Sequence, residues 1–234
     1  MSNNIDKVLS FESVSYTASS DHDVSLNGVS FELASEEALL VRIDGDSEHA
    51  PILDLALGLL PTASGSVRYM DKSWADMDAF EAAASRGRIG CVFEMPGWVS
   101  SLSVSQNVML RERHHSKRDD AELCREAEEL AKLAGLNAMC DERPDVVRRR
   151  ELRVWEWVRA CMGDPTLIIL VSPEKDAASH ALPHLIDLVE RAVSRGSSVL
   201  WLTASDTVWN HGRLSDMRRC AIEHERWKSL GEME

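Results

Sequence analysis

The sequence lacks any apolar run long enough to cross a membrane and any closely spaced cysteine pair. A spanning helix needs about 20 apolar residues, whereas the longest apolar run, residues 167–171, has only the length of a strand. The first seven residues, MSNNIDK, contain no apolar segment, so we expect no signal peptide. The five cysteines are odd in number and widely scattered, which indicates reduced thiols, no metal site and a cytosolic compartment.

Basic residues are also few. The 234 residues include 26 Lys and Arg against 39 Asp and Glu, a net charge of −13. A duplex-binding protein needs a basic surface that displaces counterions, so we expect no nucleic-acid partner. The hydrophobic fraction of 44% is enough for a sizeable core, which excludes wholesale disorder. The length fits one large α/β domain, or a core with a small inserted lobe.

Apolar patterning predicts strands near the N-terminus and strand–helix alternation near the C-terminus. Alternation of this kind favours a largely parallel sheet with helices on both faces. The predicted strands cover 8–16, 28–33, 39–43, 61–70 after a turn, 88–93, 166–171, 198–203 and 218–224. The predicted helices cover 52–60, 103–112, 119–134, 150–162 and 179–194, with a short one before the last strand.

Four segments, taken in order, resemble the ATP-binding subunits of ABC transporters. ILDLALGLLPTASGSVRY (52–69) resembles the helix and turn after the phosphate loop, and RIGCVFEMPGWVSSLSVSQNVML (88–110) resembles the Q-loop segment. ERPDVVRRRELRVWEWVRACMGDPTLIILVSP (142–173) resembles the signature helix followed by the Walker B strand. SSVLWLTAS (197–205) resembles the strand that leads to the switch histidine. The continuation of the Q-loop segment is most similar to the lipid-trafficking (Mla or MCE-type) branch.

The resemblance implies an α/β fold, a P-loop NTPase-like (RecA-like) ABC nucleotide-binding domain. Such a domain has an N-terminal antiparallel β subdomain and an inserted helical subdomain. Residues 1–234 would form one domain. Its core and β subdomain would cover about 8–93 and 164–224, and its helical subdomain about 94–163.

The phosphate loop implied by the resemblance is degenerate. His49 stands at the Walker lysine, and the glycine positions are not occupied by glycine. A phosphate cradle needs inward-pointing amides and positive charge. Asp44, Asp46 and Glu48 would instead place three carboxylates beside a polyanion and repel it, at about 1–4 kcal/mol per contact at roughly 4 Å. We therefore predict either a plain surface loop or a site rebuilt for another ligand, at Gly45, Asp46, Ser47, Glu48, His49 and Ala50.

The other positions that carry ATPase chemistry in the family are also altered. Val171 and Ser172 stand where Walker B has its aspartate and glutamate, and Ala204 stands at the switch histidine. Without those carboxylates, magnesium loses its anchor and the attacking water loses its base. Glu94 replaces the Q-loop glutamine, where it could reach a metal or serve as a cap. We predict no catalytic residue.

The signature Ser-Gly-Gly-Gln is replaced by Arg148, Arg149, Arg150 and Glu151. One interpretation is a solvated basic helix start. Because cations at a helix N-terminus oppose the helix dipole, such a start predicts an acidic partner: Asp145, Glu151 itself or another chain. The other interpretation is that the arginines act in trans on a phosphate, as an arginine finger does.

Two tryptophan features bear on partners. Trp155 and Trp157 cannot share one face of a helix, so we expect one to pack in the core and the other to meet a partner or the inserted lobe. In the family, the groove beside the Q-loop receives the membrane subunit. Trp98 would be either an exposed anchor there or buried in the helical lobe. The residues predicted to bind the partner are Met95, Pro96, Gly97 and Trp98.

These losses favour a non-catalytic pseudo-ATPase without a cofactor, which docks on the integral membrane permease of an ABC transporter. It would lie on the cytoplasmic face of the inner membrane, as a homodimer or a heterodimer with another ABC-type subunit. A second hypothesis is a weak or partner-activated ATPase that binds ATP and magnesium and uses Arg148–Arg150. A third is a stand-alone regulatory or binding protein that uses the same fold.

Overall fold

The computed structural model describes residues 7–18, 24–43, 51–223 and 226–229, and its chain divides into two compact units. The first unit comprises Met1–Arg86 and Ser198–Glu234, and the second comprises Gly87–Ser197. The predicted phosphate loop, Gly45–Ala50, lies outside the described residues. No helix in the described ranges is both long and apolar enough to cross a membrane.

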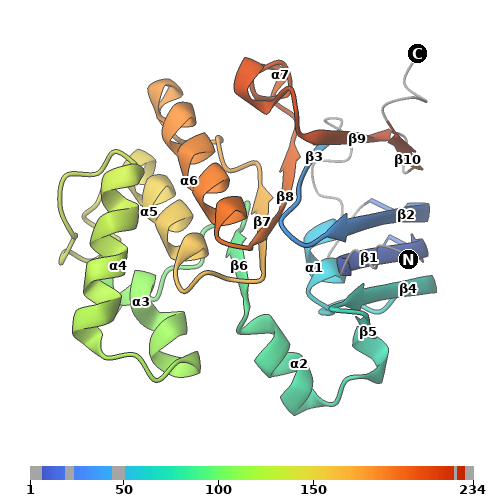
Figure 1. Ribbon diagram of the computed structural model, residues 1–234, viewed down its shortest axis with the longest axis horizontal. Helices are drawn as coiled ribbons and strands as arrows, with labels where there is room; N and C mark the ends of the chain where they lie inside the picture. The colour runs from blue at the N-terminus through green and yellow to red at the C-terminus, as the bar shows by residue number, and fades with distance from the viewer. Residues whose placement is uncertain (1–6, 19–23, 44–50, 224–225, 230–234) are drawn as a thin grey trace. The chain divides into compact units, whose positions relative to one another are not determined.

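An antiparallel sheet in the first unit has the strand order β2-β1-β4-β5 (Figure 1). Its strands are β1 (Lys7–Tyr16), β2 (Leu26–Ala34), β4 (Ser64–Tyr69) and β5 (Lys72–Ser73). Phe11 on β1 lies opposite Phe31 on β2, and their rings stack with centroids 4.6 Å apart. The alternating patterns of residues 8–16 and 28–33 therefore correctly predict two half-buried strands.

Parallel strands also occur in the first unit. β3 (Ala38–Ile43) lies between β8 (Ser198–Thr203) and β9 (Arg218–Glu223), parallel to both. β10 (Arg226–Ser229) pairs antiparallel with β9. Every residue of β8 is buried, which is typical of a parallel strand covered on both faces. Short helices complete this part: α7 (Asp206–Trp209) and the 3-10 turn η4 (Gly212–Leu214).

The predicted helix over 52–60 is shorter in the structure. α1 (Ile52–Ala56) begins after Pro51 and is followed by Gly58, whose φ of +62° is incompatible with a continuing helix. A side chain at Gly58 would also collide with the ring of Trp74. Residues 57–60 thus match the apolar spacing of a helix in sequence, but their backbone is not helical.

Residues 71–86 form elements that were not predicted from the sequence. They are β5, the 3-10 turn η2 (Trp74–Asp76) and α2 (Ala79–Arg86). Only Ala82 of α2 is buried, so the helix is fixed at its ends rather than by an apolar face. The Asp78 carboxylate accepts hydrogen bonds from the amides of Phe80 and Glu81, both at 2.8 Å.

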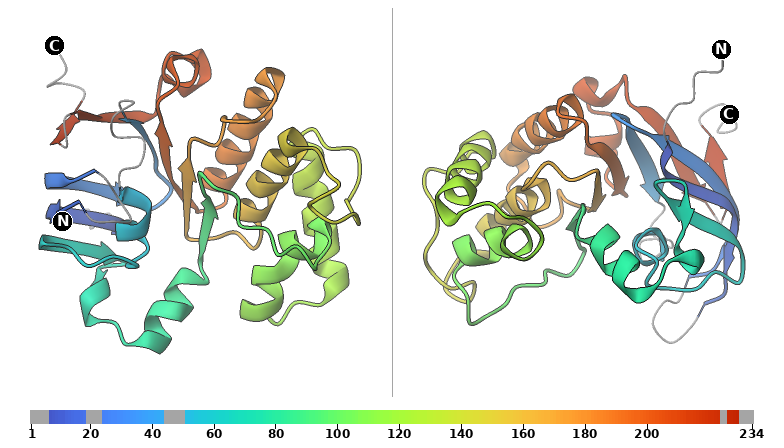
Figure 2. Two further views of the ribbon diagram at one scale, coloured as in Figure 1. Left: turned by 180° about the vertical axis from the view of Figure 1, so that it is seen from behind. Right: turned by 60° about the horizontal axis from the view of Figure 1, so that its bottom comes forward.

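The second unit, coloured green to orange in Figure 2, combines two parallel strands with four helices. β6 (Ile89–Val92) pairs with β7 (Leu167–Val171), and all five β7 residues are buried. The helices are α3 (Val104–His115), α4 (Asp120–Leu133), α5 (Arg149–Cys161) and α6 (Leu182–Ser194), the last preceded by the 3-10 turn η3 (Ser179–Ala181). The four helices predicted from apolar spacing in this region are confirmed, with ends shifted by up to three residues. α5 contacts β6, α3, α4 and α6 and therefore lies at the centre of this unit.

Candidate functional site

The candidate site is centred on the end of β7, the position that the resemblance assigns to Walker B. Val171 is the last strand residue and Ser172 follows it; both side chains are buried and uncharged. Ser172 has a φ of +42°, in the left-handed region that costs a non-glycine residue roughly 1–2 kcal/mol. This turn points consecutive backbone carbonyls of the strand end toward α5.

Arg153 of α5 occupies the space that these carbonyls face. Its side chain is only 5% exposed. The guanidinium donates hydrogen bonds to the carbonyl oxygens of Val171 (3.2 Å), Ser172 (2.8 Å), Pro173 (3.2 Å) and Phe93 (2.7 Å). A buried guanidinium is tolerated only when its donors are satisfied. Arg153 thus joins the end of β7 to the segment that follows β6.

The charge of Arg153 is balanced by Glu156, three residues further along the same helix. The closest N–O distance between them is 2.6 Å, and the Glu156 side chain is 2% exposed. Burial is the main influence on Glu156 and raises the pKa of its carboxyl group, while the nearby Arg153 opposes that rise. Glu156 also accepts a hydrogen bond from the Trp98 indole at 3.2 Å. The buried pair therefore extends the connection to the Q-loop segment.

Both tryptophans of α5 are buried, so neither is exposed to a partner, and of the two alternatives predicted for the second tryptophan only packing within the protein agrees with the structure. Trp155 is 0% exposed and Trp157 is 1% exposed. The Trp157 indole donates to the carbonyl oxygen of Pro173 at 3.0 Å. Because α5 is covered on several sides, tryptophans that point in different directions from it are both enclosed.

Two acidic residues near the strand end, Glu94 and Asp176, are paired with cations. Glu94, the residue at the Q-loop glutamine, lies 3.1 Å from the Lys175 ammonium group. Asp176, just beyond β7, forms an ion pair with Arg149 at 2.7 Å. Magnesium binds through carboxylate and other oxygen ligands. In this arrangement each carboxylate already faces a positive side chain.

The arginine triplet begins α5 on the surface. Arg148 is the N-cap residue and its side chain makes no capping hydrogen bond. Arg148, Arg149 and Arg150 are all exposed, as Glu151 is. The acidic partner expected for this basic helix start is Asp176, not Asp145 or Glu151. Asp176 lies 27 residues away from Arg149 in sequence, so local spacing could not reveal the pair.

The predicted partner-binding segment is exposed except at its tryptophan. Met95 is 78% exposed, and Pro96 and Gly97 are exposed too. Trp98 is half-buried between Glu156 and Arg159, whose guanidinium carbon lies 4.6 Å from the indole ring centroid. Trp98 therefore fixes the segment from within, while Met95 and Pro96 form its outer surface.

Ala204, at the switch-histidine position, lies in the first unit. It is exposed and follows β8, and the next residue, Ser205, caps α7 through the amide of Val208 at 3.4 Å. The methyl group of Ala204 offers no hydrogen bond to a ligand. At this strand end Ser205 therefore caps α7, and the side chain of Ala204 has no polar group that could contact a phosphate.

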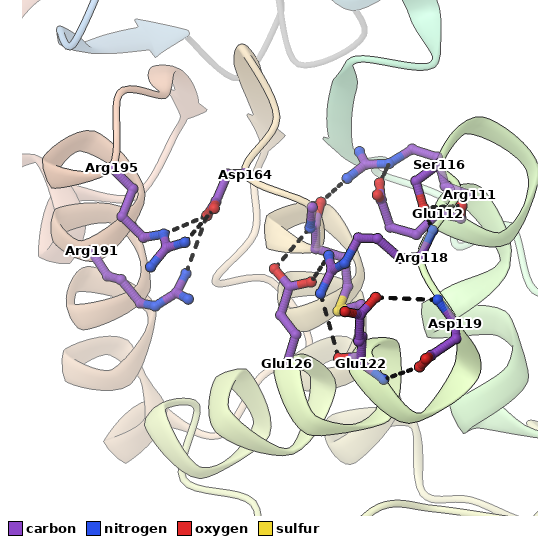
Figure 3. Close-up of polar contacts among 12 residues, drawn as sticks. Arg111, Glu112, Ser116, Arg118, Asp119, Glu122, Glu126, Asp164, Arg191 and Arg195 are labelled. Atoms are coloured by element: carbon purple, nitrogen blue, oxygen red, sulfur yellow. Dashed lines mark hydrogen bonds and ion pairs between the residues drawn. The ribbon is translucent and has the colours of Figure 1, made fainter.

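A second polar cluster, in the second unit, is internally compensated (Figure 3). Asp164 forms ion pairs with Arg191 and with Arg195, which follows α6. Glu126 on α4 forms an ion pair with Arg118 and accepts a hydrogen bond from the backbone amide of Gly163. Asp164 and Glu126 each lie against at least one cation, as expected for a network that stabilises helix packing. We assign this cluster a structural role.

Arg153 and Glu156 were not selected as site residues from the sequence. The available signal was their place in LRVWEWV, where two opposite charges three residues apart stand among large apolar residues. On an exposed helix that spacing is ordinary. It becomes informative only when the helix is known to be buried, because an unpaired buried charge is strongly disfavoured.

Replacing Glu156 by glutamine is expected to change how stability depends on pH. The carboxyl pKa of Glu156 is raised above its ordinary value of 4.5 in the folded chain, so the folded state holds this proton to higher pH than the unfolded state. The stabilisation from that difference is complete below pH 4.5 and is lost as the pH rises through the folded-state pKa. Urea titrations from pH 4 upward should show this loss in the unaltered protein and not in Glu156→Gln. Parallel pH profiles would contradict the assignment.

Comparison with solved structures gives the class of fold. The dimeric structure of MJ0796, a bacterial ABC transporter cassette, matches with a TM-score of 0.83 and 18% identity, covering 95% of this chain and 98% of that chain. The post-hydrolysis state of the ATP-binding cassette MJ0796 bound to ADP and Pi matches with a TM-score of 0.81, at the same identity and coverage. The chain therefore has the α/β fold of an ABC nucleotide-binding domain, as the resemblance implied.

Sequence comparison gives the particular relatives. The chain is 25% identical over 194 residues to the lipoprotein-releasing system ATP-binding protein LolD 1 of Rhodopirellula baltica, covering 82% of this chain and 84% of that protein. It is 22% identical over 182 residues to LolD of Chromohalobacter salexigens, covering 77% and 76%. No protein-family model matches. The chain is thus related to ATP-binding proteins of the ABC type.

Proposed function

We propose that this chain is a non-catalytic ABC-type subunit, a pseudo-ATPase, that docks on the membrane subunit of a transporter. It would act at the cytoplasmic face of the inner membrane. The transported class would be lipid, on the similarity of residues 88–110 to the lipid-trafficking branch. Neither ATP nor magnesium is needed in this function.

The observation that carries the proposal is that the buried guanidinium of Arg153 occupies the end of β7 and donates hydrogen bonds to its backbone carbonyls. Hydrolysis on this scaffold requires a magnesium carboxylate and a general base at the positions of Val171 and Ser172. Neither side chain can supply them, and the guanidinium of Arg153 bonds the carbonyls of both residues. The altered loop at Gly45–Ala50 supports the same conclusion from sequence alone.

Calorimetric titration of the full chain with magnesium–ATP tests the loss of nucleotide binding. We expect heats equal to those of buffer dilution, with a LolD-type ATP-binding protein as the positive control. Saturable binding of magnesium–ATP, or ATP turnover by the isolated pure chain, would contradict the proposal. The same titration with ADP shows whether any heat comes from ADP that contaminates the ATP.

Site-specific crosslinking tests the docking surface. A photoreactive residue at Met95, which is 78% exposed, should capture a multi-span membrane protein when the chain is isolated from its own host's membranes. Val146, which is 65% exposed, provides a matched exposed apolar position away from this segment. If the chain co-purifies with no membrane subunit and Met95 captures none, the stand-alone regulatory or binding role is supported instead.

The exposure of two arginines favours a second candidate, a partner-activated ATPase. Arg148 and Arg150 are exposed and, within the described residues, make no ion pair or side-chain hydrogen bond, whereas Arg149 is engaged with Asp176. In a homodimer, or a heterodimer with an intact subunit, these two cations could reach a phosphate bound by the other chain. ATP turnover by such a complex should then fall in Arg148→Gln and Arg150→Gln. A complex whose turnover is unchanged in both variants would exclude this candidate.

A further inference from the structure

A small groove in the second unit is lined by basic side chains. Its volume is about 320 Å³. One stripe of α3 forms its wall, since Asn107, Leu110, Arg111 and His114 follow the spacing that places residues on one helix face. His115, Arg159 of α5 and the backbone segment of Gly97 and Val99 complete it. The groove is separate from the end of β7, where Arg153 is enclosed.

The charge in this lining is of one sign. Two arginines and two histidines line the groove, and no carboxylate does. This arrangement is uncommon on a chain whose net charge is −13. The nearby carboxylates are outside the lining: Glu112 pairs with Arg111 and is 10% exposed, and Glu156 pairs with Arg153 and is 2% exposed. A solute in the groove therefore meets the cations first.

Arg159 has hydrogen-bonding capacity that the protein leaves unused. Its Nη1 donates to the carbonyl oxygen of Gly97 at 2.8 Å, and its guanidinium covers the Trp98 ring. Across the described residues, Nε and Nη2 of Arg159 make no hydrogen bond. Burial lowers the pKa of the Arg159 guanidinium; Glu156 opposes this effect, and the like charge of Arg111 adds to it. An anion beside Arg159 would stabilise its charged form.

The remaining lining groups are well placed to support an anion. Arg111 is held rigidly, because its guanidinium bonds the carbonyl oxygens of Ile89 and Met162 and pairs with Glu112 (Figure 3). It contributes positive potential without moving. His114 and His115 are exposed at the edge of the groove and, in the described part of the chain, make no hydrogen bond or ion pair. An imidazole can donate a hydrogen bond to an oxyanion.

We propose that this groove binds an oxyanion, a phosphate group either free or carried on a lipid head group, with Arg159 as its principal ligand. The guanidinium would donate through Nε and Nη2, the two nitrogens left without a partner, in the forked geometry that suits phosphate oxygens. His114 and His115 would close the outer side. This binding does not depend on the loss of ATPase activity proposed above.

The direct test follows the imidazole signals of the full chain by NMR during titration with sodium phosphate, at ionic strength held constant with sodium chloride. His114 and His115 should shift and saturate, while His180, exposed on η3, should not. Because removing a charge-assisted hydrogen bond costs about tenfold or more in affinity, Arg159→Gln should weaken binding at least that much. Arg125→Gln, an exposed arginine of α4, is the matched control and should leave binding unchanged.

Two further variants keep the test decisive if Arg159→Gln fails to fold. Arg159→Lys retains the charge but not the fork, and His114→Gln alters an exposed position; each should weaken phosphate binding while the helical circular dichroism is retained. Sedimentation with phosphatidylglycerol vesicles, against phosphatidylcholine vesicles, distinguishes the sources. Arg159-dependent sedimentation would identify a lipid head group, and saturation by phosphate without sedimentation would identify a free anion. Shifts that chloride reproduces, or that neither Arg159 variant alters, would overturn the proposal.

Discussion

Replacing Arg153 by methionine is expected to lower the free energy of unfolding by about 3–5 kcal/mol. The substitution leaves the Glu156 carboxylate buried without its cation, and it removes hydrogen bonds from the carbonyls of Val171, Ser172, Pro173 and Phe93. Each buried carbonyl left unpaired adds to the cost. Urea denaturation followed by circular dichroism measures the change.

Two comparisons make this prediction specific. Arg150→Met, an exposed arginine on the same helix, should change stability by no more than about 0.5 kcal/mol. The double variant Arg153→Met/Glu156→Met removes both charges and should recover part of the loss, because no unpaired charge remains. Full recovery would show that the carbonyl contacts contribute nothing. A loss below about 1 kcal/mol in the single variant would contradict the assignment of Arg153 as the group that joins the two segments.

Substituting Gly90 by alanine should be similarly severe, with a loss of about 3 kcal/mol or more from overpacking. Gly90 lies on β6, where α5 packs, and a Cβ atom there would overlap the carbonyl oxygen of Ala160. That oxygen belongs to helix backbone and cannot rotate away as a side chain would. The expected result is a lower midpoint of thermal unfolding, or accumulation of insoluble protein during expression.

Gly97 provides the matched control for Gly90. An added Cβ at Gly97 would meet no atom within 4 Å, and the residue is exposed. Gly97→Ala should therefore leave the free energy of unfolding nearly unchanged, since it adds neither strain nor a clash. Equal losses in the two variants would mean that close approach of α5 to β6 is not what requires Gly90.

Most elements of the fold were predictable from the sequence, because local patterns carry them. Alternating residues marked β1 and β2, and a continuous apolar run marked β7. Helical spacing of Leu123, Ala127 and Leu130 marked the buried face of α4. Residues 71–86 were not predicted in this way, since α2 has only 8 residues and buries a single alanine.

Less of the candidate site than of the fold could be predicted from the sequence. The prediction that Val171, Ser172 and Ala204 replace charged residues of the family rests on residue identity and aligned position, so it could be made from the sequence and its resemblance. The contacts that the structure forms around these positions could not be predicted from the sequence. The pairing of Arg149 with Asp176, and the contacts of Arg153 with Phe93 and Pro173, join residues 20 to 60 positions apart.

The sequence by itself thus determined the class of fold, and through its family resemblance it predicted that the residues required for ATP hydrolysis are replaced. Only the tertiary structure decided that α5 is enclosed on several sides, that Trp155 and Trp157 are both core residues, and that Arg153 and Glu156 form a buried pair. The physical reason is that burial depends on what packs against a helix and not on the helix alone. The same two charges would contribute little on a surface, whereas in the interior each requires the other.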